Sequence, residues 1–307
     1  MNGACASCGG AAWRERMQIV NLFRRPSKFR TLLALGRVSN APTVWSNCLA
    51  GWWLGGGPPW QWIWISAAVT LLYLGGMFLN DAFDAGFDRQ NRRSRPIPSG
   101  AISEKETWQW GFSLLALGAA GLIWAGTATA VLTLLLTGCI LLYNITHKLA
   151  GGAPVLMGAC RLLVYLVSAS VARQEVAGNV VWAGLALASY VMGLSWLARK
   201  ESGREPAPYW PGLLLAAPLV LAGLSDDGLT RQTGNILSLV LVVWVLWALR
   251  HAFWRAEPKV GYAVARLLAG ITLVDLLAVA DLTRPLAGLF LIWFVLALLW
   301  QRYIPAT

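Results

Sequence analysis

Long unbroken apolar runs recur along this chain and constrain its fold more than any other feature. A membrane-crossing helix needs roughly 20 apolar residues, whereas a strand of a membrane barrel shows about 10 residues of alternating polarity. The runs of helical character are 34–54, 60–80, 107–126, 128–146, 153–172, 179–198, 210–224, 234–254, 262–281 and 285–302. The seventh is short and flanked by prolines, and the ninth contains Arg266 and Asp275, so either could be a partial or tilted crossing. We therefore predict an all-α polytopic transmembrane bundle of nine to ten helices.

The charge distribution predicts how the bundle is oriented. The chain is 57% hydrophobic, its mean hydropathy is +0.56 and its net charge is +11. Such a charge could indicate nucleic acid, but the basic residues gather in the N-terminal tail and in every second connection, which is typical of cytoplasmic loops. We expect residues 1–33 to form a cytoplasmic tail without a cleavable signal peptide, and residues 34–307 to form one transmembrane domain. No nucleic-acid partner is expected.

The most informative polar segment begins at the end of the second run and reads NDAFDAGFDRQNRRSRPIPSG, from Asn80 to Gly100. In a helix, Asp81, Asp84 and Asp88 are spaced i, i+3, i+7, so their carboxylates project from one side. Like charges at this spacing repel, and a hard cation would offset them. Mg²⁺ commonly takes one or two carboxylates together with phosphate oxygens. The pattern favours a Mg²⁺ and diphosphate site over the alternative, a solvated helix end whose aspartates pair with the following arginines.

Arginines and prolines complete this segment. The guanidinium groups of Arg92, Arg93 and Arg95 can bind phosphate oxygens bidentately and can neutralise charge on a leaving diphosphate. Pro96 and Pro98 stiffen the turn and stop the helix. The loop is therefore expected to direct basic side chains toward the aspartates.

A second polar cluster follows the sixth run. Glu201 and Glu205 are spaced i, i+4 and face the same side of a helix that persists that far. They either take part in the site on the same cytoplasmic face, or form a surface pair matched to Lys200 and Arg204.

Polar residues also lie at the ends of other runs or inside them. His147 and Lys148, which follow the fourth run, are either positive-inside residues or contacts of the diphosphate. Arg161 lies roughly eight residues into the fifth run, where an arginine is costly and usually points to a partner inside the bundle. Arg37 and Asn40 raise the same question early in the first run, although an arginine there could extend to the interface.

Five cysteines are present, and those in apolar runs behave as small hydrophobic residues: Cys48, Cys139 and Cys160. Cys5 and Cys8 form a CxxC pair, which is either half of a zinc or redox site or part of an unstructured tail.

The segment from Asn80 to Gly100 resembles the first motif of the UbiA superfamily of intramembrane prenyltransferases, NDxxDxxxD followed by an RPxPSG turn. The stretch RVSNAPTVWSN, from Arg37 to Asn47, is similar to the first helix of that family. YNxxHK (Tyr143 to Lys148) together with MGACRLLVY (Met157 to Tyr165) looks more like the EboC-like branch than the quinone enzymes.

The resemblance implies an all-helical bundle, typically of nine helices, around a central cavity in which two acidic motifs hold Mg²⁺ ions that bridge a prenyl diphosphate. The family's second motif is usually DxxxD, and this chain has Glu201 and Glu205 at the corresponding spacing. The implied metal ligands are Asn80, Asp81, Asp84, Asp88, Glu201 and Glu205. The candidate catalytic residues are Asp84, Asp88, Arg92, Arg95 and Lys148. The candidate substrate-binding residues are Arg37, Asn40, Asn80, Tyr143, Arg161, Tyr165, Lys200 and Arg204.

The predicted function is transfer of a prenyl group from a Mg²⁺-bound prenyl diphosphate to an unidentified small or aromatic acceptor, with release of diphosphate. The expected location is the bacterial inner membrane, among membrane lipids, with the site open to the cytoplasm. A CDP-alcohol phosphotransferase is disfavoured, because its DGxxAR string does not occur. A lipid or isoprenoid carrier on the same fold remains the alternative.

Overall fold

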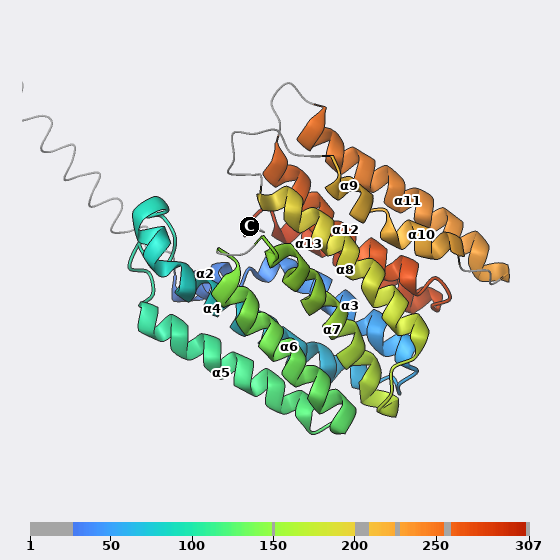
Figure 1. The fold of residues 1–307 in the computed structure, drawn as a ribbon, viewed down its shortest axis with the longest axis horizontal. Helices are drawn as coiled ribbons and strands as arrows, with labels where there is room; N and C mark the ends of the chain where they lie inside the picture. The colour runs from blue at the N-terminus through green and yellow to red at the C-terminus, as the bar shows by residue number, and fades with distance from the viewer. Residues whose placement is uncertain (1–26, 149–150, 200–208, 225–227, 255–258, 305–307) are drawn as a thin grey trace, which may run out of the picture.

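The computed structural model describes residues 27–148, 151–199, 209–224, 228–254 and 259–304. Every regular element within these ranges is a helix (Figure 1), which confirms the predicted all-α fold. The elements are α2 (Lys28–Leu35), η1 (Val38–Asn40), α3 (Ala41–Gly55), α4 (Gln61–Asn91), α5 (Glu104–Ile123), α6 (Thr127–Thr146), α7 (Ala153–Arg173), α8 (Gly178–Arg199), α9 (Pro211–Leu214), α10 (Ala217–Leu224), α11 (Gly228–Phe253), α12 (Val260–Ala278) and α13 (Arg284–Trp300).

The apolar runs agree closely with the helices from α5 to α8, whose ends differ from the predicted ones by only a few residues. Helix α4 is longer than its run, because it continues to Asn91 and carries the aspartates as part of the same helix. Among the described helices, α4, α6, α7, α8, α11 and α12 are long and apolar enough to cross a membrane. The chain is therefore an integral membrane protein. The count of nine to ten crossings and the cytoplasmic N-terminus stay predictions.

The first run, 34–54, is broken rather than continuous. Helix α2 ends before Gly36, Arg37 has a left-handed backbone with φ 42°, and α3 begins at Ala41 with Pro42 in its first turn. Proline has no N–H to donate to the preceding turn and its ring crowds that turn, so a regular helix cannot run through it. Because of the break, Arg37 lies in a turn before α3 rather than within a span.

The two doubtful runs have different outcomes. The seventh forms two short helices, α9 and α10, and Pro218 in the first turn of α10 accounts for the separation. The ninth forms α12, a continuous and largely buried helix in which Asp275 is fully buried. A carboxylate in this run therefore marks the inward face of the helix.

Close helix packing brings the polar residues together. Helices α5, α6, α7 and α8 follow one another across the bundle, and α3 packs on α7 (Figure 1). Gly51 permits the close approach of α3 to α7, because a Cβ there would lie 2.7 Å from the carbonyl oxygen of Tyr165. Gly75 plays the same part between α4 and α5, where a Cβ would lie 2.7 Å from the amide nitrogen of Leu115. These glycines therefore hold α3 against α7 and α4 against α5.

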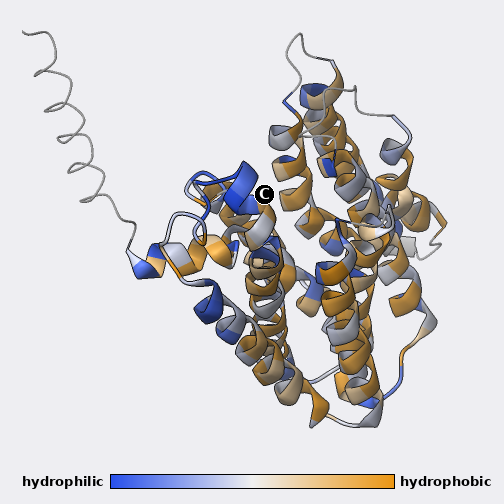
Figure 2. Ribbon diagram, turned by 60° about the vertical axis from the view of Figure 1, so that its left-hand side comes forward, coloured by the Kyte–Doolittle hydropathy of each residue, from blue (hydrophilic) through white to orange (hydrophobic). Residues whose placement is uncertain are grey.

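Hydrophobic residues cover most of the helices, and hydrophilic residues gather mainly toward helix ends and connections (Figure 2). Large apolar side chains such as Leu134 on α6 and Val243 on α11 are more than half exposed. In water such surfaces would be costly, whereas in a bilayer they contact lipid chains. The surface pattern thus agrees with the membrane assignment.

Candidate active site

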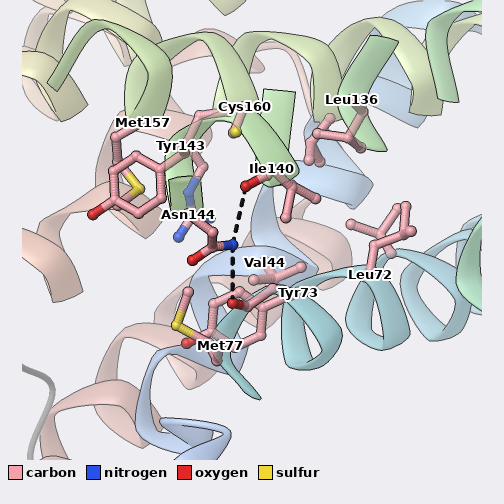
Figure 3. A pocket seen from close by; sticks show the side chains of 14 residues that line it. Val44, Leu72, Tyr73, Met77, Leu136, Ile140, Tyr143, Asn144, Met157 and Cys160 are labelled. Carbon is pink, nitrogen blue, oxygen red and sulfur yellow. Dashed lines mark hydrogen bonds between the residues drawn. The ribbon is translucent and has the colours of Figure 1, made fainter. Parts of the chain in front are cut away.

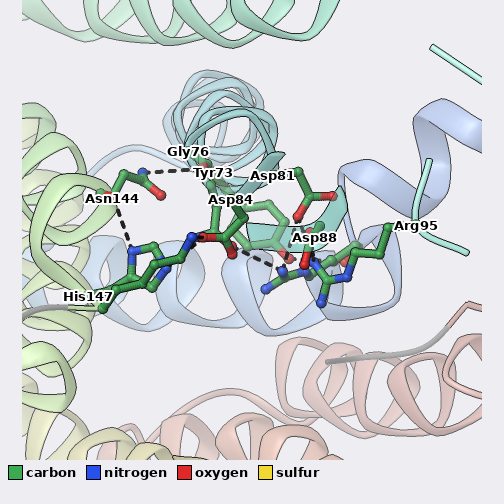
Figure 4. A network of polar contacts seen from close by, with 11 residues as sticks. Tyr73, Gly76, Asp81, Asp84, Asp88, Arg95, Asn144 and His147 are labelled. Carbon is green, nitrogen blue, oxygen red and sulfur yellow. Dashed lines mark hydrogen bonds and ion pairs between the residues drawn. The ribbon is translucent and has the colours of Figure 1, made fainter. Parts of the chain in front are cut away.

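The C-terminal end of α4 presents four oxygen-bearing side chains. Asn80, Asp81 and Asp88 are buried, with 5%, 6% and 2% of their surface exposed, and Asp84 is partly buried. The helix carries them in register until it ends at Asn91. The structure brings the three aspartates together at this end of α4 (Figure 4), with Asn80 next to Asp81 in the chain, and three of the four side chains are buried.

The loop after α4 folds back over the carboxylates. Its backbone closes through hydrogen bonds from Ser99 N to Arg95 O and from Ala101 N to Pro96 O. Arg95 Nη1 then lies 3.0 Å from Asp81 Oδ1 and 3.7 Å from Asp88 Oδ2 (Figure 4). A single guanidinium thus holds positive charge between two carboxylates. The predicted diphosphate contact Arg92 is instead exposed at the C-cap of α4.

The turn before α3 supplies a second arginine. Arg37 Nη2 donates to Asn80 Oδ1 at 3.1 Å and to Asp81 Oδ1 at 3.4 Å. Its carbonyl accepts a hydrogen bond from the Tyr73 hydroxyl at 3.0 Å, which ties the turn to α4. Asn40 is buried at the start of α3, where its carbonyl accepts from the Thr43 hydroxyl. The break in the first run therefore positions Arg37 against the acidic end of α4.

The end of α6 contributes two further basic groups. Lys148 Nζ lies 2.6 Å and His147 Nε2 3.1 Å from the same oxygen of Asp84, Oδ1. His147 Nδ1 lies 3.1 Å from the carbonyl oxygen of Asn144, so both ring nitrogens face oxygen atoms. The amide of Asn144 donates to the carbonyl of Gly76 at 3.3 Å, which fixes α6 to α4 (Figure 4).

These side chains fit a divalent cation that arrives with a phosphate ligand. The donors on α4 are carboxylate and amide oxygens, which suit a hard cation such as Mg²⁺. In the described part of the chain, no three His, Cys, Asp or Glu side chains converge on one point, so there is no cage made of protein ligands alone. Mg²⁺ that is bound with phosphates needs only one or two carboxylates from the protein. Asp81 and Asp88 already share one positive charge, the guanidinium of Arg95, so these two carboxylates lie close enough to bind a cation together.

A narrow cavity of about 90 Å³ adjoins the acidic end of α4. Its walls come from α3, α4, α6 and α7 and are mainly apolar, with side chains such as Leu72, Leu136 and Met157 (Figure 3). Tyr73, Tyr143, Asn144 and Arg161 are among its polar lining residues. The cavity lies one to two helical turns from the charged site, because Asn144 precedes His147 by one turn of α6 and Tyr73 precedes Asn80 by two turns of α4.

The remaining predicted residues on α7 lie deeper in the bundle. Arg161 Nη1 donates to the Thr43 carbonyl at 3.2 Å and to Asn47 Oδ1, and Arg161 Nη2 donates to the Thr43 hydroxyl at 3.1 Å. Tyr165 is fully buried and its hydroxyl donates to Asp275 Oδ1 at 2.7 Å, so it does not line the cavity. Sequence reasoning did not assign Asn47 or Asp275 to the site, although a carboxylate inside an apolar run was a signal for it.

The second acidic motif predicted from the sequence lies outside the described residues. Lys200, Glu201, Arg204 and Glu205 lie outside the described residues, as do Cys5 and Cys8.

Comparison with known proteins gives a consistent result. The model of the UbiA prenyltransferase family matches residues 39–271. Digeranylgeranylglyceryl phosphate synthase of Methanoregula boonei is 48% identical over 18% of this chain and 20% of its own length. Chlorophyll synthase of Arabidopsis thaliana is 32% identical over 45% of this chain and 39% of its own. The matched segments thus span less than half of these two relatives.

Solved structures share the fold at low sequence identity. A UbiA homologue from Aeropyrum pernix superposes with a TM-score of 0.60 at 20% identity, covering 80% of this chain and 97% of that one. A homologue from Archaeoglobus fulgidus bound to GPP and Mg²⁺ gives a TM-score of 0.50 at 13% identity, covering 89% and 97%. At these identities the likeness establishes the arrangement of the helices.

Proposed function

The chain belongs to the UbiA prenyltransferase family, and from this premise we propose that it transfers a prenyl group from a Mg²⁺-bound prenyl diphosphate to an acceptor, with release of diphosphate. The observation that carries the proposal is the juxtaposition of two environments. The acidic end of α4 is surrounded by Arg37, Arg95, His147 and Lys148. A mainly apolar cavity lies next to it, one to two helical turns away along α4 and α6.

The charged end suits the diphosphate. Asn80, Asp81, Asp84 and Asp88 would hold Mg²⁺, which when bound neutralises phosphate charge and stabilises the leaving diphosphate. The guanidinium groups of Arg37 and Arg95 can each donate two parallel hydrogen bonds to phosphate oxygens, and the ammonium group of Lys148 adds a compact positive charge. These groups stabilise the negative charge that develops on the leaving oxygen. Arg92 is exposed within the same loop and can approach the outer phosphate.

The apolar cavity suits the organic part of the reaction. Its walls exclude water from the allylic carbon as the bond to oxygen lengthens, so the developing cation reacts with the acceptor rather than with solvent. Glu201 and Glu205 are proposed as the second acidic motif. The curated relatives include enzymes named for a glyceryl phosphate, chlorophyll and 4-hydroxybenzoate, and this variety leaves the acceptor open.

The orientation follows from the charge pattern of the loops. We place the N-terminus, the α4 loop and the end of α6 on the cytoplasmic side of a bacterial inner membrane, from which a prenyl diphosphate can reach the basic groups. Membership of the EboC-like branch is part of the same proposal, and it rests on the Tyr143 to Lys148 and Met157 to Tyr165 segments.

The test is diphosphate release by the purified full chain in lipid nanodiscs, with Mg²⁺, prenyl diphosphates of several lengths and a panel of acceptors. We expect release that stops when Mg²⁺ is chelated and falls by at least about 100-fold in Asp84→Ala and Asp88→Ala. Glu104→Gln is the matched control, because Glu104 is an acid at the start of α5 that pairs with the exposed Arg89. Saturable binding of prenyl diphosphate without release would instead identify a carrier.

A further inference from the structure

A chain of hydrogen bonds joins a fully buried carboxylate on α12 to an arginine in the cavity wall. Asp275 is 0% exposed, and its Oδ2 accepts from Asn47 Nδ2 at 2.7 Å. The Oδ1 of Asn47 accepts from Nη1 of Arg161. The amide thus turns its donor to the carboxylate and its acceptor to the guanidinium, and this is the only orientation that satisfies both. Asp275 therefore fixes the side chain that holds Arg161.

The charge of Arg161 is only partly compensated. No carboxylate of the described residues lies within 4.0 Å of its guanidinium, and its partners are the neutral oxygens of Thr43 and Asn47. Asp275 is one amide away. A cation inside a membrane bundle is costly unless an anion or strong acceptors satisfy it. An anion in the cavity would complete its environment.

The unused donors of Arg161 have the geometry for such a ligand. A guanidinium carries five N–H groups, and within the described residues Arg161 directs two from Nη1 and one from Nη2 to protein oxygens. The N–H groups left are on Nε and Nη2, which are adjacent nitrogens of the fork. Two adjacent donors bind a carboxylate or phosphate bidentately.

The prenyl chain is a poor match for this group. A hydrocarbon offers no acceptor, and a fixed positive charge would repel the cation that develops on the allylic carbon. An anionic oxygen group avoids both problems. The diphosphate of the prenyl donor is matched by Arg37, Arg95 and Lys148 at the acidic end of α4, none of which lines the cavity that Arg161 lines. The ligand that fits Arg161 is therefore the other reactant.

We propose that Arg161 binds a carboxylate or phosphate group of the acceptor, and that Asp275 is a positioning residue that acts on Arg161 through Asn47. The identity of the ligand as the acceptor rests on the proposed function. The anion site itself rests only on the contacts of these three residues and on the place of Arg161 in the cavity wall.

A purely structural role of Asp275 makes a different prediction. Asp275 also accepts from Ser46 Oγ at 2.5 Å and from Tyr165, so it links α3, α7 and α12 regardless of Arg161. Ser46→Ala removes one hydrogen bond to Asp275 but leaves the connection through Asn47 intact. It is therefore the matched control for Asp275→Asn and for Asn47→Ala, which carries the test if Asp275→Asn does not fold.

The binding test follows thermal unfolding of the full chain in nanodiscs by the fluorescence of its 18 tryptophans. The probes are 4-hydroxybenzoate against 4-hydroxybenzamide, and glycerol 1-phosphate against glycerol. We expect one anion to stabilise the protein more than its neutral partner, and this difference to vanish in Arg161→Gln. Asp275→Asn should lower the affinity for that anion by about tenfold, and Ser46→Ala should lower it by less than twofold. The responding pair tells carboxylate from phosphate.

The double variant provides the sharpest result. If Asp275 acts through Arg161, Asp275→Asn has no further effect on anion affinity once Arg161 is Gln. An effect that persists there, an anion preference that survives Arg161→Gln, or no preference in the unmodified protein would overturn the inference.

Diphosphate release separates this inference from the proposed function. Release with an unchanged KM for the acceptor in Arg161→Gln would refute the role of Arg161 and leave the prenyltransferase activity standing. Anion binding that depends on Arg161, without release from any prenyl diphosphate, would refute the activity and leave the anion site standing.

Discussion

Replacement of Arg95 by Met should separate stability from activity at the acidic end of α4. The Arg95 side chain is 21% exposed, and its guanidinium contacts Asp81 and Asp88, which are almost fully buried. Asp81 keeps a second cation in the variant, because Arg37 lies 3.4 Å away. Asp88 has no other ion-pair partner among the described residues. The loss should therefore act mainly through Asp88.

The distances set the size of the effect. At 3.7 Å and an effective dielectric constant of about 20, two unit charges attract by about 4.5 kcal/mol. Desolvation opposes part of this attraction, but removal of one partner from a buried pair commonly costs about 3–5 kcal/mol. We expect Arg95→Met to lower the free energy of unfolding by about 3 kcal/mol. Arg89→Met should change it by less than about 1 kcal/mol, because its pair with Glu104 is exposed.

A second substitution identifies the cause. Asp88→Asn in the Arg95→Met background removes the unpaired charge, so it should restore most of the lost stability without restoring diphosphate release. Denaturant titration in mild detergent and the release assay measure the two quantities on the same samples. The reasoning is refuted if Arg95→Met is as stable as the parent protein, or if the double variant is no more stable than Arg95→Met alone.

Three further predictions test other parts of the fold. Cys139 and Cys160 have sulfur atoms 3.4 Å apart on α6 and α7, so a mild oxidant should give an intramolecular crosslink by mass spectrometry that Cys139→Ser abolishes. Gly51→Ala should cost about 1–3 kcal/mol in denaturant titration, because its Cβ would meet the backbone of α7, whereas Gly138→Ala has open space and should not destabilise the protein. Hydrogen bonds from Ser103, the N-cap residue of α5, lower the pKa of Glu106. The ionised Glu106 should therefore stabilise the fold above the ordinary carboxyl pKa, and this stabilisation should be lost as the pH falls through the lowered pKa. A pH dependence of melting that is identical in Glu106→Gln would contradict this.

Much of the fold follows from the sequence because the membrane permits few alternatives. In a hydrocarbon core each backbone polar group must be satisfied within its own segment, so apolar runs of sufficient length become helices, as α5 to α8 show. Hydropathy alone did not locate the break before α3, since residues 34–54 form one apolar run on average despite Arg37 and Asn40. Pro42 was the local signal, and its lack of an N–H acts whatever the surrounding hydropathy.

The acidic part of the site could also be predicted from the sequence, because a spacing of i, i+3, i+7 fixes which side chains share a helix face. The basic groups around the aspartates were harder to predict, since their positions depend on how the helices pack. Arg92 and Arg95 are three residues apart in one loop, yet only Arg95 reaches the buried carboxylates. Loop closure through Ser99 and Ala101 decides between them, and no periodicity encodes that closure.

The polar residues of the ninth run show how a feature that weakens a topology prediction can strengthen a functional one. Arg266 and Asp275 lower the hydropathy of α12, yet this helix is more than half buried and Asp275 lies at its centre of contacts with α3 and α7. A carboxylate costs least in a membrane where several donors converge on it, so its burial requires that Ser46, Asn47 and Tyr165 be directed inward. Because the Asn47 amide nitrogen donates to Asp275, its Oδ1 faces the other way and can accept a hydrogen bond. The group that donates to it is Arg161 at the cavity wall. The cost of burying Asp275 therefore has a reason that lies outside α12, in the orientation of a cation toward the place where the acceptor must bind.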